Sequence, residues 1–212
     1  MGKPLLIVGA GGHAAVVLDA ALTGGHPVLG LVDVNPARHG TRVLDLPVLG
    51  DDDLVLSHGT EEILLMNGIG STDSTDLRST VFKRFSEKGY RFATIVHPRA
   101  IVADSATLED GTIVMAGAVV QPRCRIGADV IINTGAQVDH DGIIGAHCHI
   151  APGAVLSGSV TVGEGAHVGT GAMVIQGVTI GADAVCAAGS VVVRDVAAGA
   201  KVAGNPATEM HP

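Results

Sequence analysis

The sequence has no tryptophan, one tyrosine and three phenylalanines, so aromatic residues make up only 2% of its 212 residues. Charged residues are also few, at 16%, and the formal net charge is -8. Any core must therefore be built from aliphatic side chains, since hydrophobic residues still account for 47%. An acidic chain without a run of Lys or Arg lacks the charge pattern of a protein that binds nucleic acid or an anionic membrane. We expect neither partner.

Long hydrophobic runs are absent too, although the mean hydropathy is positive. Gly, Asp or His interrupts every apolar stretch well before the roughly 18 residues that a membrane-spanning helix needs. The first residues, MGKPLLIVGAGGHA, contain neither a basic region nor the small-residue cleavage site of a secretory signal. We therefore expect a cytoplasmic protein.

Glycine is abundant, with 30 residues, and in the second half of the chain it belongs to an internal repeat. Aliphatic residues or cysteine occupy sixteen consecutive positions spaced by six: Val102, Leu108, Val114, Val120, Ile126, Ile132, Val138, Ile144, Ile150, Leu156, Val162, Val168, Val174, Ile180, Cys186 and Val192. Four positions after each the residue is mostly small, and three positions after it is usually Gly or Asp. Gly and Asp tolerate the left-handed backbone of a tight turn.

This six-residue period predicts a parallel β-helix in which three short strands make one 18-residue coil, with about five coils stacked on one another. The aliphatic residue of each hexad is expected to point into the core. Cys186 falls on such an aliphatic position, and Cys124 and Cys148 fall on the small inward positions. The cysteines are thus interpreted as core residues without a redox role.

The first half of the chain has a different pattern. KPLLIVGAGGHAAVVLDAAL predicts a strand, a Gly-rich turn and a helix; PVLGLVDVNP predicts a second strand; and EEILLMNGIGS, with the residues after it, predicts a third strand and a helix. The turn fits G-x-G-x-x-A, and Asp33 follows a little over 20 residues later. Peptide N–H groups at such a turn bind the phosphates of any nucleotide diphosphate. The strands are too few for a complete dinucleotide fold, so NAD is disfavoured.

The hexads from residue 102 to about 196, with the closing stretch AAGAKVAGNPATEM, resemble the hexapeptide-repeat acyltransferases. The two halves together, through VGAGGHA, DVNP, NGIGS, HPRAIV and NTGAQVDHD, are similar to the nucleotide-sugar O/N-acyltransferases of that family. This branch includes sialic acid O-acetyltransferases and the N-acetyltransferases of bacillosamine and perosamine pathways. Thr208 stands where a Lys or Arg is common in the family, so the resemblance does not predict a basic contact to coenzyme A at this position.

The resemblance implies a Rossmann-like nucleotide-sugar-binding α/β domain over residues 1–95 and a left-handed β-helix over residues 96–212. It also implies a homotrimer with acetyl-CoA as co-substrate and no metal. The expected reaction is acetylation of the amino group of a nucleotide-linked 4-amino-4,6-dideoxy sugar such as GDP-perosamine. The expected substrate-binding residues are Gly9, Gly11, Gly12, His13, Asp33, Asn67 and Gly68.

Catalytic roles follow from the same resemblance. His140 lies on an outer turn of the β-helix and matches the family's general base, an imidazole able to take a proton near neutral pH. Asp141 is the expected partner that orients it, with Asp139 as the alternative. The expected acetyl-CoA-binding residues are His149, Gly158 and His167. Gly158 is expected to stack over His140 and to donate its N–H to the thioester carbonyl.

Alternatives remain open from the sequence. The acceptor group can be a hydroxyl, as in the sialic acid O-acetyltransferases. Left-handed β-helices also include γ-class carbonic anhydrases, whose zinc is held by histidines, and His140, His147 and His149 fit such a set in number. His147 occupies a Gly-type turn position, which favours a role in the turn. A module that only binds nucleotide-sugar is the third alternative.

Outward-facing aliphatic residues predict the trimer, because a monomer would leave them in water. One predicted face carries Ile101, Val119, Val155, Met173 and Val191, and a second carries Ile113, Ile131 and Val185.

Overall fold

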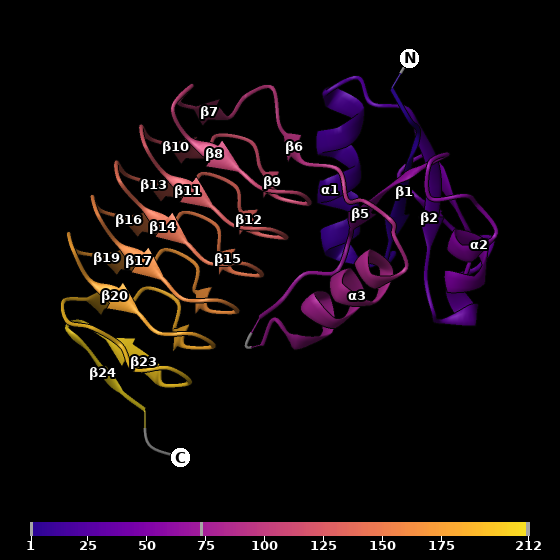
Figure 1. The fold of residues 1–212 in the computed structure, drawn as a ribbon. Helices are drawn as coiled ribbons and strands as arrows, with labels where there is room; N and C mark the ends of the chain where they lie inside the picture. The colour runs from indigo at the N-terminus through magenta and orange to yellow at the C-terminus, as the bar shows by residue number, and fades with distance from the viewer. Residues whose placement is uncertain (1, 73, 211–212) are drawn as a thin grey trace.

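The computed structural model describes residues 2–72 and 74–210. An α/β domain lies against one side of a column of stacked coils, and the last described strand of the chain lies at the end of that column (Figure 1). The two longest helices have 12 residues each, against about 20 for a bilayer span. No helix in these two described ranges is long and apolar enough to cross a membrane.

The α/β domain is built on a five-stranded sheet of order β3-β4-β2-β1-β5. Its elements are β1 (Leu5–Val8), α1 (Gly12–Thr23), β2 (Val28–Val32), a 3-10 turn η1 (Pro36–Arg38), β3 (Arg42–Val43), β4 (Leu46–Gly50), α2 (Asp52–Leu56), β5 (Leu64–Asn67) and α3 (Asp76–Glu87). The predicted three strands and two helices are β1, β2, β5, α1 and α3. The pattern missed β3, β4 and α2, because these pieces are short and Pro47 interrupts the run that forms β4.

Sixteen two-residue strands follow the predicted hexads and form the left-handed parallel β-helix. They are β7 (Ile101–Val102), β8 (Thr107–Leu108), β9 (Ile113–Val114), β10 (Val119–Val120), β11 (Arg125–Ile126), β12 (Ile131–Ile132), β13 (Gln137–Val138), β14 (Ile143–Ile144), β15 (His149–Ile150), β16 (Val155–Leu156), β17 (Thr161–Val162), β18 (His167–Val168), β19 (Met173–Val174), β20 (Thr179–Ile180), β21 (Val185–Cys186) and β22 (Val191–Val192). Before them comes β6 (Ile95–Val96), and after them come β23 (Lys201–Gly204) and β24 (Ala207–Glu209). The expected domain boundary between residues 95 and 96 falls inside β6.

The strands form three sheets, which are the three sides of the column. We call them the β7–β22 sheet (six strands), the β8–β20 sheet (five strands) and the β6–β24 sheet (eight strands). Successive coils pair in parallel register, as Val120 does with Val138. The turn position predicted to need left-handed backbone has positive φ at every repeat from residue 111 to residue 189, with Asp141 at φ 60° and His147 at φ 62°.

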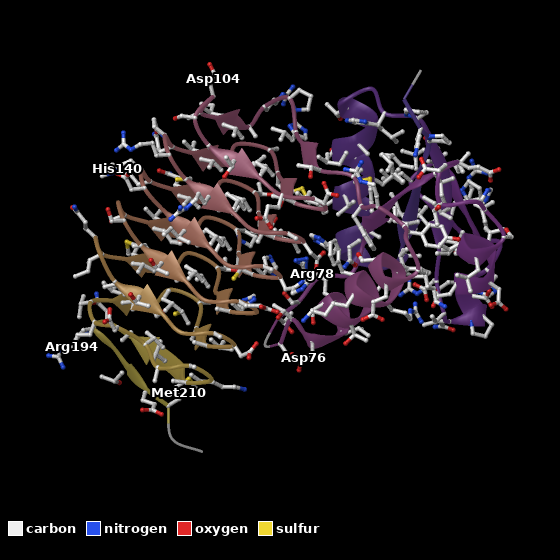
Figure 2. The ribbon with its side chains drawn as sticks, viewed as in Figure 1. Asp76, Arg78, Asp104, His140, Arg194 and Met210 are labelled. Carbon is white, nitrogen blue, oxygen red and sulfur yellow. The ribbon has the colours of Figure 1, made fainter. Side chains whose placement is uncertain are left out.

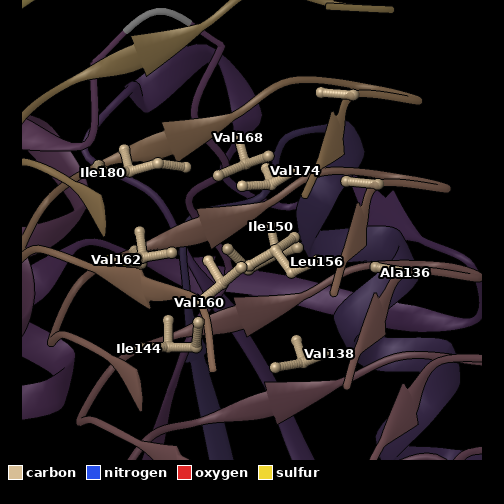
Figure 3. Packing of buried hydrophobic residues seen from close by; sticks show 14 of the residues in the cluster. Ala136, Val138, Ile144, Ile150, Leu156, Val160, Val162, Val168, Val174 and Ile180 are labelled. Carbon is tan, nitrogen blue, oxygen red and sulfur yellow. The ribbon is translucent and has the colours of Figure 1, made fainter. Parts of the chain in front are cut away.

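The interior of the column is filled by the aliphatic hexad residues (Figure 3). Val138, Ile144 and Ile150 face inward from the three sides of one coil and are at most 2% exposed. The three cysteines are buried in the same core, as the repeat predicted. Because full burial of such a side chain contributes about 1.5–3 kcal/mol, this column is the main source of stability of the β-helix.

The α/β domain covers part of the β6–β24 sheet, and this corrects one expectation. Ile113 and Ile131 were predicted to face outward into a subunit interface, but they are 1% and 0% exposed. Ile113 packs in one cluster with Val17 and Leu18 of α1, so the chain's own N-terminal domain covers it. On the β7–β22 sheet the apolar face stays partly exposed: Ile101 is 66% and Met173 49% exposed, and Val119, Val155 and Val191 are half-buried.

A buried ion pair joins α3 to the β-helix. Arg78 Nη1 lies 3.0 Å from Oδ1 of Asp129, and both side chains are at most 1% exposed. Asn67 Nδ2 also donates to this oxygen, at 3.1 Å, and His147 Nδ1 donates to the second carboxylate oxygen at 2.9 Å. A buried pair of this kind is held by its additional hydrogen bonds. The network fixes how the two domains sit against each other.

Candidate active site

A Gly-rich turn between β1 and α1 opens into a cavity of about 440 Å³. Methyl groups added at Gly11 or Gly12 would meet nothing within 4 Å, so these residues face open space. At Gly9 the backbone is left-handed, with φ 98°, and an added methyl would lie 3.0 Å from Ile69. No side chain caps the start of α1 at Gly11. The first N–H groups of the helix are therefore available to an anion.

Asp33, the residue directly after β2, stabilises this turn through hydrogen bonds. Its Oδ2 accepts a hydrogen bond from the N–H of Ala10 at 2.8 Å, and its Oδ1 accepts one from Asn35 at 2.9 Å. Arg38 Nη1 in turn donates to the carbonyl of Ala10 at 2.7 Å. The predicted fingerprint is therefore assembled in space, with the acidic residue on the wall of the same cavity.

The structure brings six of the seven predicted substrate-binding residues to this cavity: Gly9, Gly11, Gly12, His13, Asp33 and Gly68. Asn67 is the exception. Its side chain is 1% exposed and is bonded to Asp129 and to the carbonyl of Arg78, so it belongs to the domain contact and does not line the cavity. The sequence predicts a ligand group at Asn67 because it gives no sign that Arg78 and Asp129 lie beside it.

His149 of the β-helix forms the opposite wall of the cavity. Its Nδ1 lies 3.1 Å from the carbonyl oxygen of Ser71, which can only accept, so Nδ1 carries the proton. Its Nε2 then accepts from Asn133 Nδ2 at 2.9 Å. Burial, aided by the charge of His167 and Arg78, lowers the pKa of His149 to about 3. The ring is therefore neutral and held in one tautomer.

His13 lies next to His149, with the ring centroids 6.3 Å apart. Burial, with the nearby charge of Arg78, lowers the pKa of His13 to about 4. His167 stacks over His149 on the next coil, as the 18-residue period predicted, with the ring centroids 4.9 Å apart. Three histidine rings thus line one path, and the two with lowered pKa values are uncharged near pH 7.

A second cavity of about 250 Å³ continues this path along the β-helix. It shares Ser71, Thr72 and His149 with the first and is also lined by His167 and Pro152. The two cavities form one groove that runs from the Gly-rich turn across β15, β18 and β21 to the turns that follow these strands.

His140 stands on the exposed turn between β13 and β14. Its Nδ1 lies 2.7 Å from Oδ2 of Asp141, which makes Asp141 its partner, as predicted. Arg123 donates two hydrogen bonds to the same carboxylate, from Nε to Oδ1 at 2.6 Å and from Nη2 to Oδ2 at 2.8 Å. These hydrogen bonds from Arg123, and then that from His140, hold the pKa of Asp141 well below its usual range. The alternative partner Asp139 accepts the backbone N–H of His140 at 2.7 Å instead.

Gly158 lies one coil beyond His140, as the 18-residue period predicted. A methyl group at Gly158 would lie 2.6 Å from Nε2 of the imidazole, so only glycine leaves the ring accessible. With Nδ1 bonded to a carboxylate, Nε2 is the atom that can accept a proton. The arrangement is that of a general base with an open approach.

One chain does not bring His140 to the groove. The His140 turn joins the β7–β22 sheet to the β8–β20 sheet, whereas the groove lies on the β6–β24 sheet beside the α/β domain. Figure 2 shows His140 on the side of the column away from Arg78 and the domain contact. His149 and His140, both expected near the thioester, are thus on different corners of the same column.

The zinc-site reading of the three histidines finds no support. His147 is buried against Asp129 and Phe82, both ring nitrogens of His149 have protein partners, and His140 is on another corner. In the part of the chain that the structure describes, no group of three potential metal ligands is present.

Sequence reasoning missed Arg123, Ser71 and Asn133. A signal existed for Arg123, because it precedes Asp141 by one 18-residue coil and so occupies the turn directly beside it. Ser71 and Asn133 gave no comparable signal, since their contact with His149 joins residues 78 and 16 positions apart on different elements.

A hexapeptide β-helix with an exposed His140–Asp141 pair beside Gly158, joined to an α/β domain with a Gly-rich turn, is the arrangement expected of the hexapeptide acetyltransferases. The PglD N-terminal domain matches residues 4–85. Perosamine N-acetyltransferase PerB from Caulobacter crescentus, solved with CoA and GDP-perosamine, is 40% identical, with a TM-score of 0.91 over 100% of this chain and 98% of that one. A histidine-to-asparagine variant of that enzyme is also solved with both ligands.

The acetyltransferase domain of PglB from Neisseria gonorrhoeae FA1090, solved with acetyl coenzyme A, is 35% identical. It has a TM-score of 0.91 over 99% of this chain and 100% of that one. WeeI from Acinetobacter baumannii AYE, at 22% identity and a TM-score of 0.87, shares the fold. No curated protein matches the chain. The chain belongs to the family of hexapeptide acetyltransferases that contains PerB and the PglB acetyltransferase domain, and it is an acetyltransferase.

Proposed function

We propose that this enzyme transfers the acetyl group of acetyl-CoA to the amino group of a nucleotide-linked 4-amino sugar. The observation that carries the proposal is the single groove that joins the phosphate-binding turn at residues 9–12 to the wall of the β-helix. In this proposal the nucleotide binds at one end of the groove and the sugar at the other. The relatives solved with GDP-perosamine, CoA and acetyl-CoA support the same two substrates.

The proposed chemistry is direct transfer. The sugar nitrogen attacks the thioester carbonyl, Nε2 of His140 takes the proton that this nitrogen loses, and the sulfur of CoA leaves and receives a proton. Asp141, held by Arg123, keeps Nδ1 of His140 protonated and the ring in place. All three cysteines are buried in the core, so no thiol nucleophile is available for an acyl-enzyme.

Gly158 is the proposed oxyanion donor. Within the described residues its N–H makes no backbone hydrogen bond, so it is available to the thioester oxygen beside His140. A donor of this kind contributes roughly 3 kcal/mol to transition-state stabilisation. His149 and His167 serve as walls of the groove, since both ring nitrogens of His149 already have partners.

A trimer completes the site. In one chain His140 faces away from the groove, and the β7–β22 sheet leaves Ile101 and Met173 exposed. Packing this aliphatic face against another copy would remove it from water. It would also bring His140 of the partner subunit to the sugar end of the groove. Both co-substrates are cytoplasmic metabolites, and we place the enzyme in the cytoplasm.

The test uses the purified protein with acetyl-CoA and a panel of UDP-, dTDP- and GDP-linked 4-amino-4,6-dideoxy sugars. Release of free thiol reports turnover, and the matched 4-hydroxy sugars are the control for the acceptor group. Thiol release with an amino sugar and none with its hydroxy counterpart is the expected result. Thiol release with the hydroxy sugars alone would replace this proposal by O-acetylation, and none with any sugar would contradict it.

A further inference from the structure

A third cavity, of about 320 Å³, lies directly beside the phosphate-binding turn. It shares Gly9, Asp33 and Ile69 with the groove, so the two spaces meet at the end of β1 and β2. Its other walls come from the loop after β2, from α2 and from α3. A ligand whose phosphates sit at residues 9–12 can therefore extend into this cavity in the direction away from the sugar.

The walls of the cavity are largely apolar. Val34, on the loop after β2, is 73% exposed, and Leu77, in the first turn of α3, is 66% exposed. They line the cavity from two different elements, and Ile69 and Val81 line it as well. Two such exposed aliphatic side chains beside an apolar cavity are suited to hold a flat ring, which would cover them.

One end of the cavity is polar. Asp52 Oδ2 accepts a hydrogen bond from Arg84 Nη2 at 2.5 Å. Its other oxygen, Oδ1, is shielded from water and has no hydrogen-bond partner in the parts of the chain that the structure describes. A shielded acceptor without a partner is destabilising, and a ligand N–H that reached it would remove this cost. The Arg84 side chain is 43% exposed, so it can shift to let a ring reach the carboxylate.

We infer that this cavity is the base subsite of the nucleotide-sugar and that Asp52 selects guanine. The inference rests on the proposed function and deepens it. Guanine presents a carbonyl oxygen followed by two donors, N1–H and the 2-amino group. Arg84 matches the carbonyl oxygen, and the carboxylate of Asp52 matches the two donors. Uracil and thymine carry a carbonyl oxygen where guanine carries the amino group, and that oxygen would face the carboxylate of Asp52.

Calorimetric titration of the full-length protein with GDP, UDP, dTDP and ADP tests the assignment without any acetyl transfer. The wild-type protein should bind GDP at least about 10-fold more tightly than the other three, the size of one matched base contact. Asp52→Asn keeps the shape but removes the charge and places an amide donor at one position, so it should lose most of this preference. UDP binding should change little.

Asp53→Asn is the matched control. Asp53 lies in the same first turn of α2 and is exposed, but it does not line the cavity, so this variant removes the same charge from the helix and should keep the preference for GDP. A thermal melt of both variants checks folding. Equal affinity for all four nucleotides in the wild type, or an Asp52→Asn variant that keeps the full GDP preference, would overturn the inference.

The outcomes also separate this inference from the proposed function. If UDP- or dTDP-linked amino sugars are acetylated and their nucleotides bind more tightly than GDP, the acetyltransferase function stands and the guanine assignment falls. If GDP is preferred through Asp52 but no linked amino sugar is acetylated, the base subsite stands and the proposed acceptor falls.

Discussion

Nδ1 of His140 lies 2.7 Å from Oδ2 of Asp141, the neighbouring residue, which adopts left-handed backbone to reach it. The left-handed turn that the β-helix requires in every coil thus also places the carboxylate against the imidazole. Arg123, at the same turn position one coil earlier, holds that carboxylate with two hydrogen bonds. The turn residues that the β-helix needs for its fold therefore also hold the proposed general base in place.

Asp141→Asn should lower kcat by roughly 10- to 100-fold while leaving both KM values within a few-fold, because the amide no longer fixes the tautomer of the base. Asparagine also adopts left-handed backbone readily, so the turn should be kept. The measurement is steady-state kinetics with each substrate varied in turn. Arg123→Met is the comparison, and it should reduce kcat less, because exposed ion pairs contribute little. A fully active Asp141→Asn enzyme would show that the carboxylate has no part in the reaction.

Acid should destabilise the protein from about pH 6.5 down to about pH 3. Burial lowers the pKa of His13 to about 4 and of His149 to about 3, from 6.5 in the unfolded chain. In this window the unfolded chain binds protons that the folded chain does not, so stability is complete above pH 6.5 and is lost as the pH falls. Each histidine contributes up to about 1.4 kcal/mol per pH unit within its window.

Urea unfolding at pH 7.5, 6 and 5 measures this slope. His149→Gln should reduce the slope, even though it also lowers stability at pH 7.5 through loss of the Ser71 contact. His58→Gln is the comparison variant at a partly exposed histidine. A slope that is the same in the wild type and in His149→Gln would mean that the buried ring titrates normally.

Gly11→Val should raise the KM for the nucleotide-sugar by 10-fold or more and leave that for acetyl-CoA nearly unchanged. A methyl at Gly11 meets no protein atom, so the larger side chain enters only the space reserved for phosphate. Gly68→Ala is the contrasting variant, because its methyl would lie 2.7 Å from Ile7 and should lower the melting temperature. Equal increases in both KM values for Gly11→Val would argue against a nucleotide at this turn.

Mixed oligomers test whether the site is shared between subunits. Gly11→Val and His140→Asn chains, each poorly active alone, should regain activity when they are unfolded and refolded together. A groove with intact Gly11 can then meet an intact His140 of the partner subunit at about one quarter of the sites, for random mixing in equal amounts. Light scattering of the wild type should give a trimer. A monomer, or mixtures no more active than the separate variants, would contradict a shared site.

The hexad repeat made most of the β-helix predictable, because each position has one physical requirement: Val138 must be apolar to fill the core, and Asp141 must tolerate positive φ. The same register also correctly placed Gly158 over His140 and His167 over His149. Periodicity relates residues within one regular element and fixes them in space without further information.

Contacts between the two domains could not be predicted in this way. Ile113 has the pattern of an outward residue and is outward with respect to the coil, yet α1 covers it. Asn67, Arg78 and Asp129 meet only because α3 packs along the corner of the β-helix. The sequence contains no period that links residue 67 to residue 129, so the contact between Asn67 and Asp129 could not be predicted.

The most direct test of the proposed mechanism is the turnover of His140→Asn at neutral pH with saturating acetyl-CoA and amino sugar. Asparagine is similar in size but cannot take the proton, so turnover should fall by about 100-fold or more while both ligands still bind, and it should recover in part at higher pH as more of the amine is neutral. No acetylated protein should be trapped in an intact-mass measurement. Near-normal turnover at neutral pH, or an acetylated enzyme, would contradict direct transfer with His140 as the base.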